Sequence, residues 1–401
     1  MDTTRKNLPL LLVFGALAVE GLGIKNGHDA LPFLLIILSP VVLIDLIFYR
    51  KMLILPKYSS VFFVFFIFSS FISAFLGIGF YNSFINSLYL LSEFVVFVCF
   101  YNYRVHIKKK LSVIIFCIPI LFSIYSLVLN LHILNLFIPY NGYQFVYEKL
   151  GHNHLGDFLV LPTVFIIFRL YYKQMRKIFL PFLALFLLII FISHSRSAYL
   201  TILFSTFLIH TSYFHHKKAS IYKTLSRTLI LILVLLTFFL VTGASNQSAK
   251  LQVFPINIAT YNQAHNDQKT LLGYRPAYYK QSLNSIMAHP ILGIGSNNFE
   301  KTSLRYALNK NLEVTKSAHN IFLEVMVGQG ILGIIPFLGF LLFIILRSKR
   351  NELFFIFLAM LMNFQTDYTY QIYSFFTLFI VFCAILVYDK ELKLYFVNEK
   401  K

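Results

Sequence analysis

Charged residues are scarce in this chain of 401 residues, and acidic residues are the scarcest of them. Only 13% of the residues are charged, whereas 58% are apolar, and the mean hydropathy is +0.72. A soluble domain of this length cannot bury so much apolar surface. The composition therefore excludes a soluble globular protein and indicates a protein whose surface faces lipid.

The chain also lacks the local signatures of nucleotide, redox and zinc chemistry. It contains no Walker loop, no dinucleotide-binding glycine fingerprint and no His-Glu-x-x-His sequence. The three cysteines, Cys99, Cys117 and Cys383, fall within apolar segments without metal-ligand spacing, so packing is their expected role. We therefore predict no cofactor and no metal, and neither energy coupling nor redox chemistry.

Apolar runs long enough to cross a bilayer recur along the whole chain. Runs of about 17 to 22 residues match roughly 30 Å of hydrocarbon when they are helical. We predict an all-α polytopic membrane protein, one integral membrane domain over 1–401, with about twelve transmembrane helices. The first also fits a signal peptide, although Glu20 favours a retained anchor, and the short eleventh also fits a re-entrant arm. The predicted spans are 8–24, 31–49, 60–80, 84–102, 111–130, 155–171, 178–193, 198–214, 228–243, 321–346, 352–364 and 371–388.

Basic residues indicate the orientation of the bundle, because Lys and Arg in short loops are retained on the cytoplasmic side. With the N-terminus inside, the outer short loops hold only Lys25, Lys149 and Arg196. We therefore predict that both termini are cytoplasmic. The net charge of +19 is explained by an inner collar that meets anionic lipid head groups, so no nucleic-acid partner is expected.

A long polar loop, 244–318, separates the ninth and tenth predicted spans and lies on the outer face. Every polar cluster of interest emerges on this face. One cluster, at the outer entry of the sixth span, contains His152, His154 and Asp157. A metal site is one interpretation, but a helix turns the two histidines apart and no third ligand is evident. A polar lining of an outer substrate cavity and simple helix capping are the alternatives.

Arg196 lies in a very short outer connection, 193–198, between the seventh and eighth spans. Its guanidinium is held close to two helix ends and can bind a phosphate or a carboxylate through two parallel hydrogen bonds. The alternative is an arginine that reaches from the membrane to the interface without a further role.

Arg275 opens a predicted helix in the long loop. Pro276 suits a first helical turn, His289 and Pro290 end the helix, and Gly293 begins a tight turn. We predict that this helix lies across the membrane mouth, with Arg275 at its N-terminal end, where backbone N–H groups also favour anions. A surface helix with a solvated arginine is the alternative. One apolar face is predicted to contain Tyr279, Leu283, Ile286 and Met287.

His319 stands where the long loop re-enters the membrane, and Asn320 follows it. A neutral imidazole near pH 7 is a competent general base, worth roughly 10² to 10⁴ in rate when it is well placed. A structural interfacial histidine is the alternative. Asp157 and Asp367, both at outer helix ends, are candidates to position an arginine or an acceptor. Asn320 and Asp367 are also candidates to line the substrate cavity.

These motifs, in this order and on one face, resemble the O-antigen ligase and polymerase superfamily of bacterial envelope glycosyltransferases. The likeness is most specific in 193–198, 273–299 and 317–333. It implies a GT-C-like fold in the bacterial cytoplasmic (inner) membrane with an extracytoplasmic active site. It also implies metal-independent, inverting transfer of a glycan from undecaprenyl diphosphate to a hydroxyl acceptor. By the resemblance, Arg196 and Arg275 would grip the diphosphate, and His319 would take the acceptor proton.

Three functions are carried forward. The first is a ligase that loads a lipid-anchored acceptor such as lipid A-core, and the second is a polymerase whose acceptor is another undecaprenyl-linked chain. The third is a non-catalytic exporter of lipid-linked glycans, which would need polar residues at several depths of the bundle. Glu93 lies near the middle of the fourth span, and we expect it to make a buried hydrogen bond to a neighbouring helix.

Overall fold

The computed structural model describes eight segments of the chain, which belong to two compact units. Unit 1 comprises Met1–Leu111, Leu272–Lys349 and Phe364–Lys401, and unit 2 comprises Ser112–Leu271 and Arg350–Asn363. The predicted spans 8–24 and 228–243, and loop residues 244–274, lie outside the described segments. The described segments are 27–50, 52–130, 152–172, 179–193, 195–216, 275–306, 315–387 and 390–395.

Unit 1 is built from long apolar helices. Within the described residues, three helical stretches are long and apolar enough to cross a membrane: Lys57–Leu76, Phe80–Lys108 and Ile321–Arg347. The first is α3 and the third is α13, and these two helices pack along each other. Phe63 of α3 joins them, with its ring 5.0 Å from that of Phe340. These features confirm a membrane protein with a mainly helical fold.

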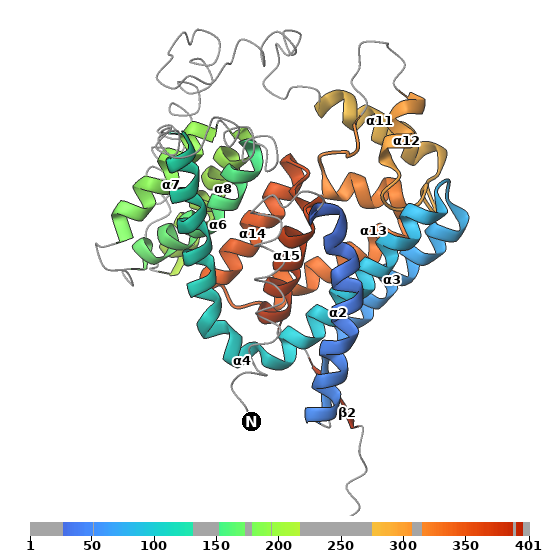
Figure 1. Ribbon diagram of the computed structural model, residues 1–401, viewed down its shortest axis with the longest axis horizontal. Coiled ribbons are helices and arrows are strands. Elements are labelled where there is room, and N and C mark those ends of the chain that lie inside the picture. Colours follow the sequence, from blue (N-terminus) through green and yellow to red (C-terminus); the bar gives the residue numbers. More distant parts are fainter. Residues whose placement is uncertain are drawn as a thin grey trace, which may run out of the picture. The chain divides into compact units, whose positions relative to one another are not determined.

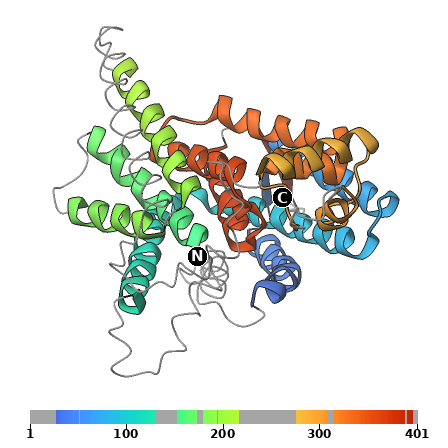
Figure 2. The ribbon, with the colours of Figure 1, turned by 90° about the horizontal axis from the view of Figure 1, so that it is seen from above.

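The remaining helices of unit 1 lie close to the predicted spans. Helix α2 covers Gly27–Arg50, and α15 covers Tyr373–Leu386 after a short 3-10 turn, η3, at Thr369–Gln371. Two short helices of the long loop, α11 (Arg275–Ala288) and α12 (Phe299–Tyr306), sit beside α13 (Figures 1 and 2). The predicted start of α11 at Arg275 and its end before His289 are confirmed. A small buried core ties the loop to α13; its members are Ile294, Phe299, Ala318 and Val327.

Helix α13 is broken at Gly330, whose backbone is left-handed with φ 61° and ψ −156°. The turn after α11 fills the break with its own backbone. Ile294 N–H donates to the Val327 carbonyl at 2.9 Å, and Ile331 N–H donates to the Pro290 carbonyl at 2.9 Å. A side chain at position 330 would strike the Ile291 carbonyl, so only glycine fits. The long loop is therefore anchored inside the membrane-spanning helix.

Helix α4 (Phe80–Asn130) contains both predicted spans 84–102 and 111–130, and its stretch Phe80–Lys108 is long and apolar enough to cross a membrane. The segment between the two spans contains neither glycine nor proline, so it can stay helical.

One prediction about the fold is wrong. The chain is not purely α-helical, because β1 (Met52–Pro56) pairs antiparallel with β2 (Glu391–Tyr395). This ribbon joins segments that are far apart in the sequence, which a local pattern cannot reveal.

Unit 2 contains α6 (His152–Tyr171), α7 (Leu180–Ser193) and α8 (Arg196–His216). The predicted spans 155–171, 178–193 and 198–214 are thus helical, with bounds shifted by a few residues. Helix α6 packs against both α7 and α8. Helix α14 (Glu352–Thr366) starts in this unit, where Glu352 forms an ion pair with Arg169 of α6 at 3.0 Å.

Candidate functional site

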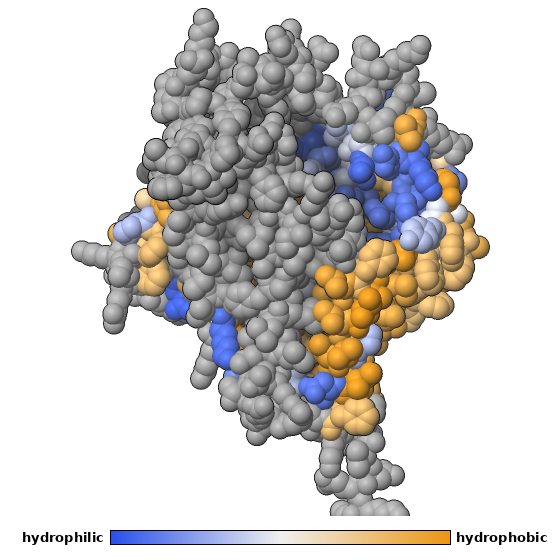
Figure 3. Space-filling view, in the orientation of Figure 1, coloured by the Kyte–Doolittle hydropathy of each residue, from blue (hydrophilic) through white to orange (hydrophobic). Residues whose placement is uncertain are grey.

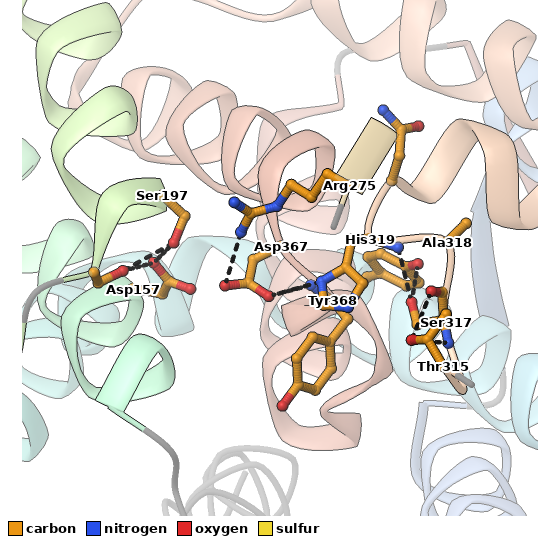
Figure 4. Close-up of polar contacts among 12 residues, drawn as sticks. Asp157, Ser197, Arg275, Thr315, Ser317, Ala318, His319, Asp367 and Tyr368 are labelled. Atoms are coloured by element: carbon orange, nitrogen blue, oxygen red, sulfur yellow. Dashed lines mark hydrogen bonds and ion pairs between the residues drawn. The ribbon is translucent and has the colours of Figure 1, made fainter. Parts of the chain in front are cut away.

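Unit 1 brings Arg275 and His319 together around one buried carboxylate, that of Asp367. Arg275 is the first residue of α11, His319 lies in the turn before α13, and Asp367 follows α14. Both side chains point toward Asp367 (Figure 4). Three separate parts of the chain therefore meet here: Arg275 and His319, the predicted catalytic pair, and Asp367 between them.

Arg275 keeps much of its hydrogen-bonding capacity. Its Nη2 lies 3.7 Å from Asp367 Oδ2, which is an ion pair but not a tight bidentate one. Among the described residues, no hydrogen-bond partner is present for its buried Nε atom. The side chain is 18% exposed, whereas Asp367 is fully buried. A guanidinium has five N–H donors, so Arg275 can still bind an anion.

The imidazole of His319 is held by the same carboxylate and by two tyrosine rings. Its Nδ1 lies 3.4 Å from Asp367 Oδ1, without the alignment of a good hydrogen bond. The ring stacks on Tyr278 of α11 at 5.3 Å and meets Tyr368 edge-on at 4.9 Å. Asp367 Oδ1 also accepts the Tyr368 backbone N–H at 2.7 Å, which orients the carboxylate. Nε2 is the ring nitrogen that does not face Asp367.

The turn that carries His319 is strained and is held by a polar network. His319 has φ 52°, a left-handed conformation that costs a residue other than glycine about 1 to 2 kcal/mol. Its backbone N–H donates to Ser317 Oγ at 3.1 Å, and Ser317 Oγ lies 2.7 Å from the Tyr370 hydroxyl. Glu324 Oε2 accepts the Ala318 N–H at 2.8 Å and the Tyr370 hydroxyl at 3.1 Å. These bonds impose the conformation that points the imidazole at Asp367.

Tyr370 has a hydroxyl that stays protonated in this network. Burial, and then the nearby Glu324 carboxylate, raise the pKa of Tyr370 well above its ordinary value of 10.0. The neutral phenol can therefore act as a donor to Glu324 at any physiological pH.

Asn320 has a structural position beside the cluster. Its Oδ1 accepts the backbone N–H groups of Phe322 and Leu323 at 3.0 and 3.1 Å, so it caps α13. Its Nδ2 donates to the Gln365 carbonyl at 3.4 Å, which also accepts the Tyr279 hydroxyl at 3.3 Å. Burial raises the pKa of Tyr279 above 10.0, which keeps this phenol a donor. Asn320 thus fixes the start of α13 against α14.

Unit 2 holds a second polar cluster, built on Asp157. Ser197 Oγ and Ser195 Oγ donate to Asp157 Oδ1 at 2.6 and 3.0 Å, and all three side chains are buried (Figure 4). The two serines flank Arg196, the first residue of α8, so Asp157 fixes the turn that presents Arg196. The Arg196 side chain, like those of His152 and His154 at the start of α6, lies outside the described part of the structure.

Part of the chain matches a known protein family. Residues 181–338 match the family model described as O-antigen ligase. The predicted resemblance to the O-antigen ligase and polymerase superfamily is confirmed. The matched segment contains Arg196, Arg275 and His319, and it supports a membrane glycosyltransferase of the O-antigen ligase or polymerase type. Among curated proteins, none matches this chain.

Three residues of this site were given no role in the sequence predictions. Glu324 follows His319 by five positions, in the first turn of α13, and an acidic residue at that point of an apolar helix was the available signal. Tyr278 directly precedes Tyr279 of the predicted apolar face, and Tyr370 lies in η3. Their contacts with the His319 turn cross from one element to another, so spacing alone does not indicate them.

The part of the chain that the structure describes shows no metal centre. There, no three His, Cys, Asp or Glu side chains are grouped so that they could hold an ion. The expectation of metal-independent chemistry stays a prediction.

Proposed function

We propose that this protein is an O-antigen ligase-like glycosyltransferase. It moves a glycan from undecaprenyl diphosphate to a hydroxyl acceptor such as lipid A-core, on the extracytoplasmic side of the bacterial cytoplasmic membrane. In the proposed topology both termini are cytoplasmic. The observation that carries the proposal is the shared carboxylate: Asp367 lies 3.4 Å from the His319 ring and 3.7 Å from Arg275. A general base and an anion-binding group are thus next to each other.

His319 is the proposed general base. Its Nδ1 carries the proton that faces Asp367, and its Nε2 accepts the proton of the acceptor hydroxyl. The acceptor oxygen attacks the anomeric carbon of the donor sugar as the bond between that carbon and the diphosphate oxygen breaks, which inverts the configuration. The imidazolium that forms is stabilised by the Asp367 carboxylate, in the way that a buried aspartate supports a catalytic histidine in hydrolases.

Arg275 is the proposed diphosphate ligand. The leaving diphosphate gains negative charge in the transition state, so a fixed guanidinium stabilises the transition state more than the bound donor. Each charge-assisted contact is worth about 1.5 to 3 kcal/mol. Arg196 is proposed as the second diphosphate ligand on the strength of the resemblance. His152, His154 and Asp157 are proposed to line the cavity for the substrate. No metal or nucleotide is then required.

A non-catalytic exporter of lipid-linked glycans is disfavoured by the surroundings of Glu93. This residue is fully buried, and its Oε1 accepts a hydrogen bond from Thr377 of α15. The expected bond to a neighbouring helix is therefore confirmed, and Glu93 serves to join α4 to α15. Glu93, the strongest candidate for a polar group on a transport path, thus has a partner on a neighbouring helix.

The decisive experiment measures glycan transfer by the purified protein in lipid nanodiscs, with an undecaprenyl-diphosphate glycan as donor and lipid A-core as acceptor. His319→Ala and Arg275→Ala should each lower the rate by about 10² to 10⁴. Lys316→Ala, at an exposed position close to His319 in sequence, is the matched control and should transfer normally. Substantial transfer by His319→Ala would remove the general-base role.

The same assay separates the two branches of the superfamily. A ligase attaches the whole glycan to lipid A-core, whereas a polymerase joins one undecaprenyl-linked glycan to another. Addition of EDTA should leave either reaction unchanged. If EDTA abolished transfer and Mg²⁺ restored it, the metal-independent mechanism would be wrong.

A further inference from the structure

Helix α11 buries polar side chains and exposes two large apolar ones. The buried side chains are Tyr278, Gln281, Ser282 and Ser285. Leu283 and Met287, which are four positions apart, are 52% and 72% exposed. Ile286, which also belongs to the predicted apolar face, packs instead against the small core between the loop and α13. A helix on a water-soluble surface buries its large apolar side chains, so the exposed side of α11 suits an apolar environment.

The apolar surface of α11 continues onto α13. Ile291, one further turn along the chain, is 60% exposed and is fixed beside the α13 break, because Leu332 N–H donates to the Ile291 carbonyl at 3.3 Å. Ile331 and Leu332 of α13 are 45% and 44% exposed at that point. These five residues, Leu283, Met287, Ile291, Ile331 and Leu332, form a strip that we call the apolar ramp.

The lower end of the apolar ramp joins a surface that already faces lipid. Ile335 lies one turn beyond Ile331 on α13 and is 60% exposed, within a helix that is long and apolar enough to span the membrane. Apolar side chains also gather over the long helices of unit 1, below a polar cap in the region of α11 and α12 (Figure 3). The ramp is thus continuous with the membrane-facing surface and rises from it toward the cap.

Lys280 marks the upper end of the ramp. It is exposed and lies three positions before Leu283 and seven before Met287, on the same side of α11. A lysine at one end of an apolar helix face is typical of helices that lie in a membrane interface, where the ammonium reaches the lipid phosphates. The order of lysine, leucine, methionine and isoleucine therefore matches that of a helix that enters a lipid leaflet with its charge at the surface.

We propose that the apolar ramp is inserted into the outer leaflet of the lipid bilayer, with Lys280 at the head-group layer. The occupant is the bilayer itself, because the ramp continues onto the exposed apolar side of α13, a helix that is long and apolar enough to span a membrane. The consequence of this placement for catalysis rests on the proposed function. Arg275, at the other end of α11, would then be held at a constant height above the leaflet, where the diphosphate of a membrane-bound donor lies.

Tryptophan fluorescence can test this placement, since the chain has no tryptophan of its own. Met287→Trp and Ile291→Trp are each prepared in nanodiscs made with ordinary or with chain-brominated phospholipids, without any donor. Both should show blue-shifted emission that the brominated lipid reduces by about half or more, because quenching requires contact with the acyl chains. Lys316→Trp is the control and should emit as a solvated indole without quenching.

Each other outcome contradicts the proposal in a recognisable way. Blue-shifted emission without bromine quenching would mean that another part of the chain or a second copy covers the ramp. Red-shifted emission would mean that the ramp is in water. If either tryptophan prevents folding, as judged by thermal unfolding, Leu283→Trp replaces it as the probe. The fluorescence does not depend on glycan transfer. If the protein did not transfer glycans, the fluorescence could still place the ramp in the bilayer. If the ramp were not in the bilayer, the transfer assay would still test the proposed function.

Discussion

Two polar regions of unit 1 use their hydrogen bonds differently. At the break of α13, Gln329 uses both ends of its amide: Oε1 accepts from Ser69 Oγ at 2.7 Å, and Nε2 donates to Ser296 Oγ at 3.1 Å. Around Asp367, in contrast, the contacts with His319 and Arg275 measure 3.4 and 3.7 Å. The first region binds the chain to itself, whereas the contacts in the second are longer and looser.

This contrast separates stability from function in the two regions. Buried polar groups that are fully paired make a fold rigid, and a break in such a network is destabilising. Groups that are held in place but only loosely paired can strengthen their contacts when a ligand or a transition state arrives. Mutations at the α13 break should therefore change unfolding, and mutations around Asp367 should change transfer. The four predictions that follow test this division.

The largest effect on transfer is expected for Asp367→Asn. The amide keeps the size of the side chain but removes the charge that orients His319 and stabilises its imidazolium. The transfer rate should fall by about 10² to 10⁴ while the unfolding temperature changes little. A comparable fall in the unfolding temperature would show that Asp367 serves mainly to hold the fold. Asp157→Asn, in unit 2, provides a comparison with another fully buried carboxylate.

Gly330→Ala should have the largest effect on stability. The new methyl group would strike the Ile291 carbonyl, and position 330 has φ 61°. We expect a loss of about 2 to 4 kcal/mol in unfolding free energy, measured by denaturation in detergent. Gly339→Ala is a weaker control, because there the neighbour is the flexible ring of Phe62. Equal stability of the two variants would contradict the anchoring of the loop in α13.

Arg275→Lys should have an intermediate effect. Lysine keeps the charge but presents a single ammonium in place of the planar fork. We expect kcat/KM to fall by about 10 to 100, corresponding to the loss of one charge-assisted contact. Lys280→Arg, on the exposed side of the same helix, should leave kcat/KM close to that of the natural protein. A fully active Arg275→Lys variant would show that the fork is not used.

Tyr370→Phe should have the smallest effect. The substitution removes the hydroxyl that lies 2.7 Å from Ser317 Oγ and 3.1 Å from Glu324 Oε2, so the His319 turn loses part of its support. Since Tyr370 is a positioning residue, kcat should fall by about 3 to 10 while KM stays the same. Tyr89→Phe, which removes a bond to the Tyr373 carbonyl, is the matched control. A changed KM with an unchanged kcat would instead place Tyr370 at the substrate.

Local sequence patterns predict those parts of the site that depend on neighbouring residues. Pro276 and His289 mark the two ends of α11, and the entry of His319 and Asn320 marks the start of α13, because caps and breakers act over one turn. Asp367 was also singled out from its position at an outer helix end. Its contact with His319 joins the turn before α13 to the residue after α14, and a single sequence does not show which distant residues are in contact.

The features that the sequence did not predict have the same physical origin. The face of α11 that is buried, which includes Gln281 and Ser285, depends on the surroundings of the helix. Helix α4 continues through a run of basic residues, because such a run marks an interface by charge but does not end a helix. Glu324 and Tyr370 support His319 through contacts between separate elements, which propensity does not encode.

The ribbon of β1 and β2 has a consequence for biogenesis. Its strands pair Met52 with Tyr395, so β1 leaves the ribosome long before its partner is made. At roughly 5 to 20 residues per second, β1 waits for tens of seconds as an incomplete strand. One of its edges is already occupied, because the Asn102 amide bonds both the N–H and the carbonyl of Ile54 at 3.1 and 2.8 Å. The other edge pairs with β2, so the arrival of β2 late in synthesis leaves β1 no open edge for aggregation.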